Sequence, residues 1–400
     1  MTVSTFRNQL INHVIPLVSG QALFQTAAIL VATFSGLVGF NLAEDKSLAT
    51  LPIAVISVGT AVMLIPASLL MKKYGRKKGF ITGIALGFLA GMITSAGIYF
   101  HNFWVFVIGN MLIGCYQGFS QYYRFAAAES VDEKFKSKAI SWVVSGGVFA
   151  AIVGPYLARY TKDLGNIPFL YSYLAISVLS LISFLIISRL KPQQVKEAES
   201  VNSHQERPLS KIVKQPAFIA AIISSATGSS VMIMVMTATP IAMKLCGHTA
   251  DDSAIVIQWH VLGMFVPSFF TGNLIQRFGA TRIISMGILM FVIHVSFALT
   301  GTDFLHFVSG LVFLGIGWNF MFIGGSFILT RSYTTGDQAK TQAFHDFIAF
   351  AIISISSFLA GAILNAWGWK MVNIVVIPML IIAIISVQWF AFLQKKTVLS

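Results

Sequence analysis

Only one acidic residue lies clearly inside a long apolar segment of this sequence, which makes it the first candidate for proton chemistry. Asp346 stands in the run Q-A-F-H-D-F at positions 342–347. A carboxyl group held away from water has its neutral form favoured, so it can load and release a proton near neutral pH. His345 is adjacent but points about 100° away around a helix, and His260 lies in another apolar segment. We expect Asp346 to carry a proton, with His345 and His260 as weaker candidates. The structural alternative is an acid at a helix N-terminus.

A second set of polar residues follows one face of the apolar segment 103–128. The residues, separated by 4, 3, 4 and 3 positions, are Asn110, Gly114, Gln117, Gln121 and Arg124. This is the spacing of one helical face, and amides are costly in lipid, so the face is expected to line a cavity and bind substrate. The cation of Arg124 would attract an anionic group. Alternatively, Arg124 is structural and pairs with Glu129.

Four more residues are candidates for substrate contact. Gln21 and Gln25 are four positions apart, so they share a face of the first apolar segment. Trp318 and Asn319 belong to the run G-W-N-F in a later apolar segment. A polar side chain in lipid needs a partner, which is either a substrate or a neighbouring helix. We predict substrate binding for all four, with interhelical hydrogen bonding as the alternative for the glutamines.

Membrane-length helices must position these residues, because the composition leaves little room for other elements. Hydrophobic residues make up 56% and charged residues 10% of the 400 positions, and the mean hydropathy is +0.79. A helix crosses a hydrocarbon core of about 30 Å with about 20 residues, and twelve stretches are long enough. They lie at about 14–40, 48–71, 79–100, 103–128, 139–158, 168–187, 217–243, 254–275, 283–299, 304–329, 343–367 and 372–393. We therefore predict an all-α, multi-pass membrane protein.

The lysines and arginines predict the orientation of these segments. With the N-terminus inside, 21 of the 27 basic residues fall on the inner side and five on the outer side. Because inner loops carry the excess of positive charge, we expect both termini in the cytoplasm and the protein in the cell's inner membrane. The net charge of +13 then belongs to a basic membrane face, and no nucleic-acid partner is needed to explain it.

A short basic turn occurs twice, at corresponding places in two halves of the chain. It reads S-L-L-M-K-K-Y-G-R-K-K at 68–78 and G-N-L-I-Q-R-F-G-A-T-R at 272–282, which places Gly75 and Gly279 204 positions apart. A turn repeated at half-length between membrane helices indicates two parallel repeats. The stretch 190–215 is charged and poor in large apolar residues, as in a cytoplasmic linker. We predict six-helix bundles at 1–189 and 216–400, joined by this linker.

The paired turns resemble a motif of the major facilitator superfamily, G-x-x-x-D-[R/K]-x-G-[R/K]-[R/K], which lies between the second and third helices of those transporters. The matching positions are Lys73, Gly75, Arg76, Gly272, Arg277 and Gly279. In the family, the acidic residue of the motif holds the cytoplasmic gate. Lys72 and Gln276 occupy that position here. The resemblance implies that all these residues contribute to gating, with a weaker cytoplasmic lock than is usual.

Gly154 and Pro155 resemble part of a fifth-helix signature of facilitator-type antiporters, G-x-x-x-G-P-x-x-G-G. The resemblance implies a gating role and slightly favours export. The alternative is a helix bend without any bearing on antiport, because a proline inside a helix frees a carbonyl group.

The resemblance covers essentially the whole chain, so it implies a twelve-helix major facilitator fold around a central cavity. The implied function is secondary transport of a small organic solute by alternating access, coupled to protons and carried out by a monomer, with export slightly favoured. Proton-coupled uptake of an anionic metabolite through Arg124 is one alternative, and a non-transporting receptor or scaffold is another. The sequence contains no phosphate-binding glycine loop, nucleophile motif or metal-ligand spacing. We therefore expect neither an enzyme nor a cofactor.

Overall fold

The computed structural model describes residues 10–399 apart from 46–47, 49–50, 192–206 and 335, and it contains helices without strands in this part of the chain. The chain divides into two compact units. Unit 1 comprises Met1–Glu133 and Val143–His204, and unit 2 comprises Lys134–Trp142 and Gln205–Ser400. Most of the predicted linker, 190–215, lies outside the described residues.

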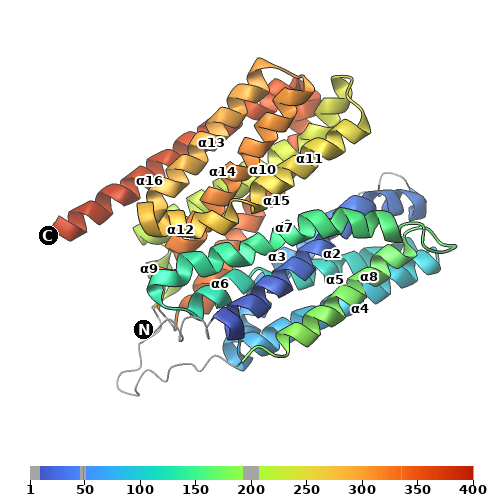
Figure 1. Ribbon diagram of the computed structural model, residues 1–400, viewed down its shortest axis with the longest axis horizontal. Helices are drawn as coiled ribbons and strands as arrows, with labels where there is room; N and C mark the ends of the chain where they lie inside the picture. Colours follow the sequence, from blue (N-terminus) through green and yellow to red (C-terminus); the bar gives the residue numbers. More distant parts are fainter. Residues whose placement is uncertain (1–9, 46–47, 49–50, 192–206, 335, 400) are drawn as a thin grey trace. The chain divides into compact units, whose positions relative to one another are not determined.

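Unit 1 consists of long apolar helices joined by short turns (Figure 1). Its elements are η1 (Leu10–Val14), α2 (Ile15–Leu42), α3 (Leu51–Tyr74), α4 (Arg76–Tyr99), α5 (Phe103–Ser120), α6 (Tyr123–Glu129), the part of α7 (Lys136–Thr161) from residue 143 on, and α8 (Leu170–Ile187). Helix α4 packs against α5 and α8, α5 packs against α3, and α2 packs against α8. Leu30, Phe106 and Tyr173 lie in the core that these helices share.

The segment predicted as a single helix at 103–128 is interrupted. Helix α5 ends at Ser120 and α6 begins at Tyr123, with Gln121 and Tyr122 in a turn between them. The Tyr122 hydroxyl donates to the Leu64 carbonyl of α3 at 2.7 Å, which fixes the turn against a neighbouring helix. The predicted polar face therefore continues through a break in the helix rather than along a straight one.

Unit 2 repeats this helical construction. It contains the first turns of α7, α9 (Leu209–Ile212), α10 (Pro216–Leu245), α11 (Ala250–Phe265), α12 (Ser268–Phe278), α13 (Ala280–Thr300), α14 (Phe304–Leu329), α15 (Gln338–Ile374) and α16 (Val376–Leu399). Helix α14 packs against α10, α11 and α13, and α10 also packs against α15. The 3-10 turn η3 (Glu133–Phe135) precedes α7.

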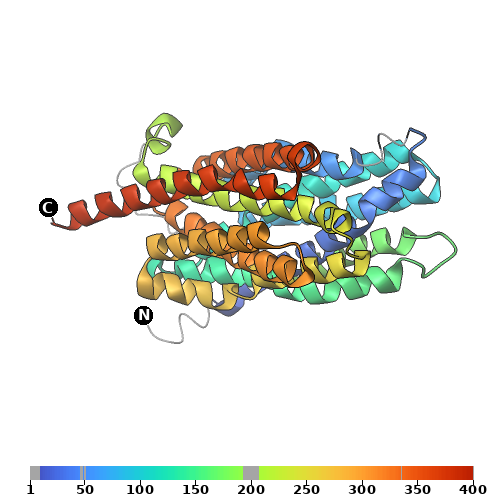
Figure 2. The same ribbon diagram turned by 90° about the horizontal axis from the view of Figure 1, so that it is seen from above.

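The number of membrane crossings depends on a kink near the C-terminus. Eleven helical stretches of the described chain are long and apolar enough to span a membrane, and the last, Gln338–Lys396, has 59 residues, which suffices for two crossings. Gly368 interrupts it with φ 78° and ψ −178°, a conformation that is essentially restricted to glycine. Figure 2 shows the chain turning back from α15 into α16. Counted separately, these two helices give the twelve predicted crossings.

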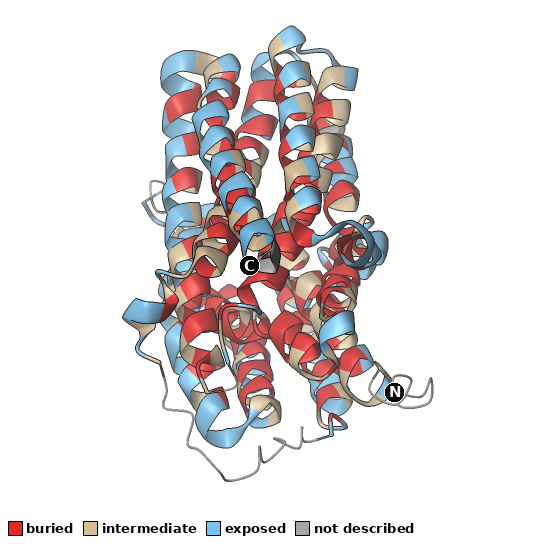
Figure 3. Cartoon of the chain, turned by 90° about the vertical axis from the view of Figure 1, so that its left-hand side faces the viewer, coloured by how far each residue is buried: buried red, intermediate tan, exposed pale blue. Residues whose placement is uncertain are grey.

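The surfaces of both units carry large apolar side chains that a soluble protein would bury. Figure 3 shows buried and exposed residues alternating around the same helices. Among the exposed side chains are Leu185 on α8, Phe358 on α15 and Ile385 on α16. Such continuous apolar exposure is costly in water and is the normal outer surface of a protein in lipid.

The repeated basic turn has the same backbone conformation in both units. Gly75 has φ 89° and ψ 157°, and Gly279 has φ 86° and ψ 150°. The amide of Gly75 donates to Met71 O and that of Gly279 to Ile275 O, each at 2.9 Å. These acceptors are themselves 204 positions apart. The sequence repeat is therefore also a repeat of local structure, and it needs glycine in both copies.

Candidate functional site

Arg124 and Gln121 form a direct pair beside the interruption between α5 and α6. The guanidinium Nη1 donates to Gln121 Oε1 at 2.7 Å, and the guanidinium carbon lies 4.4 Å from the centre of the Phe125 ring. Arg124 is 5% exposed. Glu129, its predicted alternative partner, forms a bidentate pair with Arg76, with Nη2–Oε1 at 2.7 Å and Nε–Oε2 at 3.1 Å. An amide and an aromatic ring thus hold the cation of Arg124 within unit 1.

The amides of Gln21, Gln25 and Gln117 in unit 1 are partly exposed and keep hydrogen-bonding capacity. Gln21 Nε2 lies 3.5 Å from Gln25 Oε1 on α2, a long hydrogen bond. Gln117 accepts from Thr60 Oγ1 of α3 at 3.2 Å. An amide has two donor hydrogens and an oxygen with two lone pairs, so one such contact leaves further sites for a polar ligand.

Asn110 lies in a buried polar network. Its Nδ2 donates to Phe106 O at 2.9 Å, and its Oδ1 accepts from Ser35 Oγ at 3.0 Å. The Ser35 hydroxyl in turn lies 2.7 Å from the Tyr173 hydroxyl. The network joins α2, α5 and α8, and Asn110 is fully buried. We therefore interpret Asn110 as a residue that holds the helices together, rather than as a substrate ligand.

Trp318 lies in an aromatic group in unit 2. Its ring stacks on Phe322 with centroids 4.8 Å apart and an interplanar angle of 13°, and it meets Phe265 edge to face at 5.9 Å. The indole Nε1 donates to Ser229 Oγ of α10 at 3.2 Å. Phe322 is partly exposed, whereas Trp318 and Phe265 are buried. The buried Trp318 and Phe265 thus support Phe322, whose partly exposed ring is of a kind on which a planar ring can stack.

Asn319 stabilises the break between α11 and α12. Its Nδ2 donates to Met264 O and Ser268 Oγ, at 2.6 Å and 2.5 Å, and its Oδ1 accepts from Thr271 Oγ1 at 2.6 Å. Pro267, which has no N–H group, lies at this break. Because these contacts use the donors of a fully buried amide, we assign Asn319 to the fold of unit 2 rather than to substrate binding.

Asp346 and His345 are in direct contact, and the expectation that His345 points away is wrong. His345 Nδ1 lies 2.8 Å from Asp346 Oδ1, and their side chains are 1% and 2% exposed. Adjacent helical positions are about 100° apart, but rotation about the side-chain bonds brings these two groups together. Phe218 of α10 covers the imidazole edge to face at 6.2 Å. A buried imidazole and carboxylate in contact can share and exchange one proton.

His260 is engaged elsewhere in unit 2. Its Nδ1 donates to Leu311 O of α14 at 2.8 Å, and it is fully buried. Helices α11 and α14 approach closely here, since a Cβ atom on Gly315 would lie 2.6 Å from His260 O. The imidazole therefore helps to bind α11 to α14, which is the structural role that a lone histidine often has.

The residues of the two basic turns are mostly exposed. Lys72, Lys73, Gln276 and Arg277 lie exposed at the ends of α3 and α12. Gln276, at the position of the family's acid, donates through Nε2 to the carbonyl of Lys134, just before α7. An amide thus makes a neutral contact where the family motif would place a charge.

The beginning of α7 is attached to α12 within unit 2. Gly272 N donates to Ser141 Oγ at 3.0 Å, and Ser137 Oγ donates to Gly272 O at 3.1 Å. Ser141 Oγ also donates to Ser268 O. A Cβ atom on Gly272 would lie 2.6 Å from Lys138 Cα, so this contact requires glycine. The two serines were not among the predicted site residues, although their spacing of four places them on one helical face.

Gly154 and Pro155 lie inside α7. A Cβ atom on Gly154 would lie 2.8 Å from Ile29 Cγ2 of α2, within unit 1. Close helix packing therefore explains the glycine, and the pair by itself favours neither direction of transport.

Asp337 forms an ionic centre that the sequence did not reveal. Arg207 Nε lies 2.6 Å from Asp337 Oδ2 and Lys340 Nζ lies 3.1 Å from Oδ1, while Thr334 Oγ1 donates to Oδ2 at 3.2 Å. Burial opposes the charge of this carboxyl, but the hydrogen bonds from Arg207, Lys340 and Thr334 outweigh it and lower its pKa. Arg207 and Asp337 are 130 positions apart, so no local sequence pattern predicted this pair.

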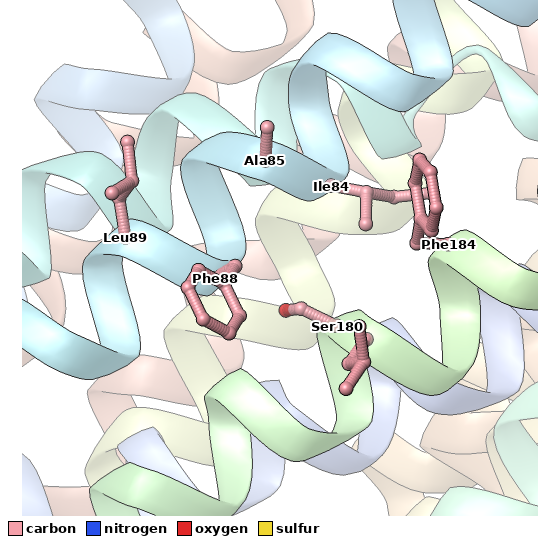
Figure 4. A pocket seen from close by; sticks show the side chains of 7 residues that line it. Ile84, Ala85, Phe88, Leu89, Ser180 and Phe184 are labelled. Carbon is pink, nitrogen blue, oxygen red and sulfur yellow. The ribbon is translucent and has the colours of Figure 1, made fainter.

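Two grooves lie away from all these residues. One, between α4 and α8, has a cavity volume of about 350 Å³ and is lined by apolar side chains such as Phe88 and Phe184, with Ser180 as its polar member (Figure 4). The other lies between α13 and α16 and is apolar apart from Ser296. None of the predicted substrate residues lines either groove. Their composition suits hydrocarbon chains better than a polar solute.

Comparison with known proteins identifies the class of protein to which this architecture belongs. The family model described as the Major Facilitator Superfamily matches residues 17–258 and 249–398. The chain belongs to this superfamily. It is accordingly a multi-pass membrane transporter of a small molecule, without enzymatic activity.

Two individual transporters are similar to this chain along most of its length. The chain is 38% identical over 385 residues to the riboflavin transporter RfnT of Brucella anthropi, which covers 96% of each protein. It is 26% identical over 347 residues to the uncharacterised transporter YdeG of Bacillus subtilis, covering 83% of this chain and 80% of that protein.

Solved structures support the fold. The fucose:proton symporter FucP of E. coli matches with a TM-score of 0.76 at 18% identity, over 94% of this chain and 98% of FucP. A bacterial homologue of the iron transporter ferroportin matches with a TM-score of 0.70 at 14% identity, over 94% and 99% of the two chains.

Proposed function

We propose that this protein transports a flavin, namely riboflavin or a molecule with the same tricyclic ring. The observation that carries the proposal is the 38% identity to a riboflavin transporter over 96% of both chains. Similarity at this level along the whole length supports a shared class of substrate.

The described side chains fit the chemistry of riboflavin, which combines a flat heteroaromatic ring with an uncharged polyhydroxyl chain. In unit 2, Phe322 is partly exposed and stacks on the buried Trp318, so it offers an aromatic surface for such a ring. Unit 1, considered by itself, contains partly exposed amides on Gln21, Gln25 and Gln117, and amides of this kind can bind hydroxyl groups. A neutral substrate needs no counter-charge, so the buried Arg124 is assigned to the α5–α6 interruption instead of to an anion.

We further propose that transport is coupled to protons through the His345–Asp346 pair. The pair is buried, and its two ionisable groups are 2.8 Å apart. A change in the hydration of this region during transport would alter the affinity of the pair for a proton and link a proton gradient to the solute. The excess of basic residues on one side supports cytoplasmic termini in the inner membrane. We expect a monomer to carry out the cycle.

Counterflow tests the substrate separately from the coupling. Purified protein is reconstituted into vesicles loaded with unlabelled riboflavin, and the entry of labelled riboflavin is measured without a pH gradient. We expect exchange that lumichrome, the tricyclic ring without the chain, inhibits and that ribitol alone does not. Absence of riboflavin exchange by a monodisperse protein would overturn the substrate assignment. Exchange with Trp318→Leu should be weakened, whereas exchange with the lipid-facing control Leu185→Ala should be unchanged.

A further inference from the structure

His294 of α13 stands between two acceptor oxygens in the interior of unit 2. Its Nδ1 lies 2.9 Å from Gly310 O of α14, and its Nε2 lies 3.0 Å from Asn373 Oδ1 of α15. Both His294 and Asn373 are fully buried. Gly310 allows this approach, because a Cβ atom there would lie 3.3 Å from His294 Nδ1.

The orientation of the Asn373 amide is fixed by a second contact. Its Nδ2 donates to Trp369 O, one helical turn earlier, at 2.9 Å. Exchanging the oxygen and nitrogen of this amide would place Oδ1 against the Trp369 carbonyl, so that two acceptors would face each other. Oδ1 is therefore the atom that faces His294.

A neutral imidazole cannot satisfy this arrangement. It carries one N–H group, so one of its nitrogens would present a lone pair to an oxygen at 2.9 or 3.0 Å. An imidazolium donates from both nitrogens and satisfies both oxygens. We propose that His294 is a proton-binding site and that the described conformation is its proton-loaded form.

His260 provides an internal comparison. It bonds to Leu311 O, the carbonyl next to that of Gly310, but its Nε2 has no hydrogen-bond partner in the described part of the chain. One N–H group satisfies His260, so its neutral form fits its surroundings. The two buried histidines thus bond to consecutive carbonyls of α14, but the contacts of His294 require protons on both ring nitrogens and those of His260 require only one.

Other ionisable side chains near α13 are at the surface or distant. His306 and Asp303 form a 3.6 Å pair at the start of α14, where the Asp303 side chain is 88% exposed. Asp346 lies 22 positions before the kink at Gly368, or about 33 Å of helix, whereas Asn373 follows that kink. The ionisable residues that are exposed on α12, α13, α15 and α16 are Arg277, Arg282, Lys370, Lys395 and Lys396. His260 is the ionisable neighbour most directly placed to oppose the charge of His294.

Proton loss at His294 would loosen the connection between α15 and α16. Asn373 and Trp369 belong to the short segment that follows the kink at Gly368. In the loaded form, His294 joins this segment to α13 and α14. Deprotonation removes one of the two hydrogen bonds and leaves a lone pair facing an oxygen, which favours movement of residues 369–374 away from α13. The proton thus controls the packing of this end of unit 2.

Magic-angle-spinning NMR of the full-length protein in lipid tests the proposal directly, using 15N-labelled histidine. His294→Gln identifies the His294 signals among those of the eight histidines. At pH 6 we expect both His294 ring nitrogens to resonate as protonated, whereas His260 shows one protonated and one unprotonated nitrogen. Asn373→Leu should lower the ratio of imidazolium to imidazole at His294 about ten-fold, while Asn373→Asp should raise it.

A neutral His294 at pH 5 in wild type, unaffected by Asn373→Asp, would overturn the proposal. Should His294→Gln fail to fold, the isosteric Asn373→Asp variant still assigns the signal through its selective change. The measurement involves no transported solute. The result for His294 is therefore independent of the proposed flavin and of the His345–Asp346 pair. Only the coupling of this proton to transport rests on the proposed function.

Discussion

Alanine at Gly279 should destabilise the protein by about 1–3 kcal/mol through backbone strain alone. Gly279 has φ 86° and ψ 150°, a region essentially closed to residues with a side chain. A Cβ atom there would meet no atom within 4 Å, so no steric clash contributes to the cost. Gly75, at φ 89° and ψ 157°, has equally open surroundings. We therefore expect Gly75→Ala to cost a similar amount.

Gly361 offers a matched control within the same chain. It lies inside α15 with an ordinary helical backbone, and a Cβ atom there also meets nothing within 4 Å. Alanine is favoured over glycine in a helix by about 0.8–1 kcal/mol, so Gly361→Ala should stabilise slightly. The two kinds of substitution add the same methyl group to open space and differ only in backbone conformation.

Equilibrium unfolding in mixed micelles measures the difference. Protein in dodecyl maltoside is titrated with dodecyl sulfate, and the free energy of unfolding is read from tryptophan fluorescence. We expect the free energy of unfolding of Gly75→Ala and Gly279→Ala to be about 2–4 kcal/mol lower than that of Gly361→Ala. This difference is the sum of the backbone strain at the turns and the gain in helix propensity at Gly361. If Gly279→Ala were as stable as Gly361→Ala, the strained turn and its equivalence in the two repeats would be refuted.

Substitutions at three further residues test individual side chains. Asp346→Asn, which resembles the permanently protonated acid, should abolish accumulation driven by a pH gradient while leaving riboflavin counterflow largely intact; normal accumulation would exclude this carboxyl as the carrier. Arg124→Lys should lower the thermal midpoint less than Arg124→Gln, and neither should change selectivity for anionic over neutral solutes, which competition assays would reveal. Asp337→Asn should destabilise by about 1–3 kcal/mol at pH 7. Folding lowers the pKa of Asp337, so its carboxylate stabilises the folded protein above the unfolded-state pKa of about 4. This stabilisation disappears as the pH falls through the lower folded-state pKa. The free energies of unfolding of wild type and Asp337→Asn should therefore become equal in acid.

The sequence predicted the helices and the repeat because their signals are local. Apolar runs of membrane length needed no tertiary information, and the basic turns around Gly75 and Gly279 proved to share one backbone conformation. The breaks were harder to predict. The break at 121–122 follows from packing of Tyr122 on α3, and the one at Pro267 is stabilised by Asn319 from a distant helix.

Pairings between side chains were the least predictable part of the site. The bidentate pair of Glu129 with Arg76, 53 positions away, was not among the predicted pairings, because it joins separate helices. His345 was expected to point away from Asp346, because spacing along a helix describes where side chains begin and not where their rotamers end. His294 gave no signal at all, since its two acceptors, a carbonyl of α14 and an amide of α15, come together only in the folded chain.

Simultaneous measurement of riboflavin and protons tests whether the protein transports a flavin coupled to protons. Vesicles containing the protein and an internal pH-sensitive dye receive external riboflavin at equal pH on both sides, and flavin fluorescence and internal pH are followed together. We expect riboflavin to cross and the internal pH to change with it. The Asp346→Asn variant should keep riboflavin exchange but lose the pH change. A folded wild-type protein that moves neither riboflavin nor protons would contradict proton-coupled flavin transport.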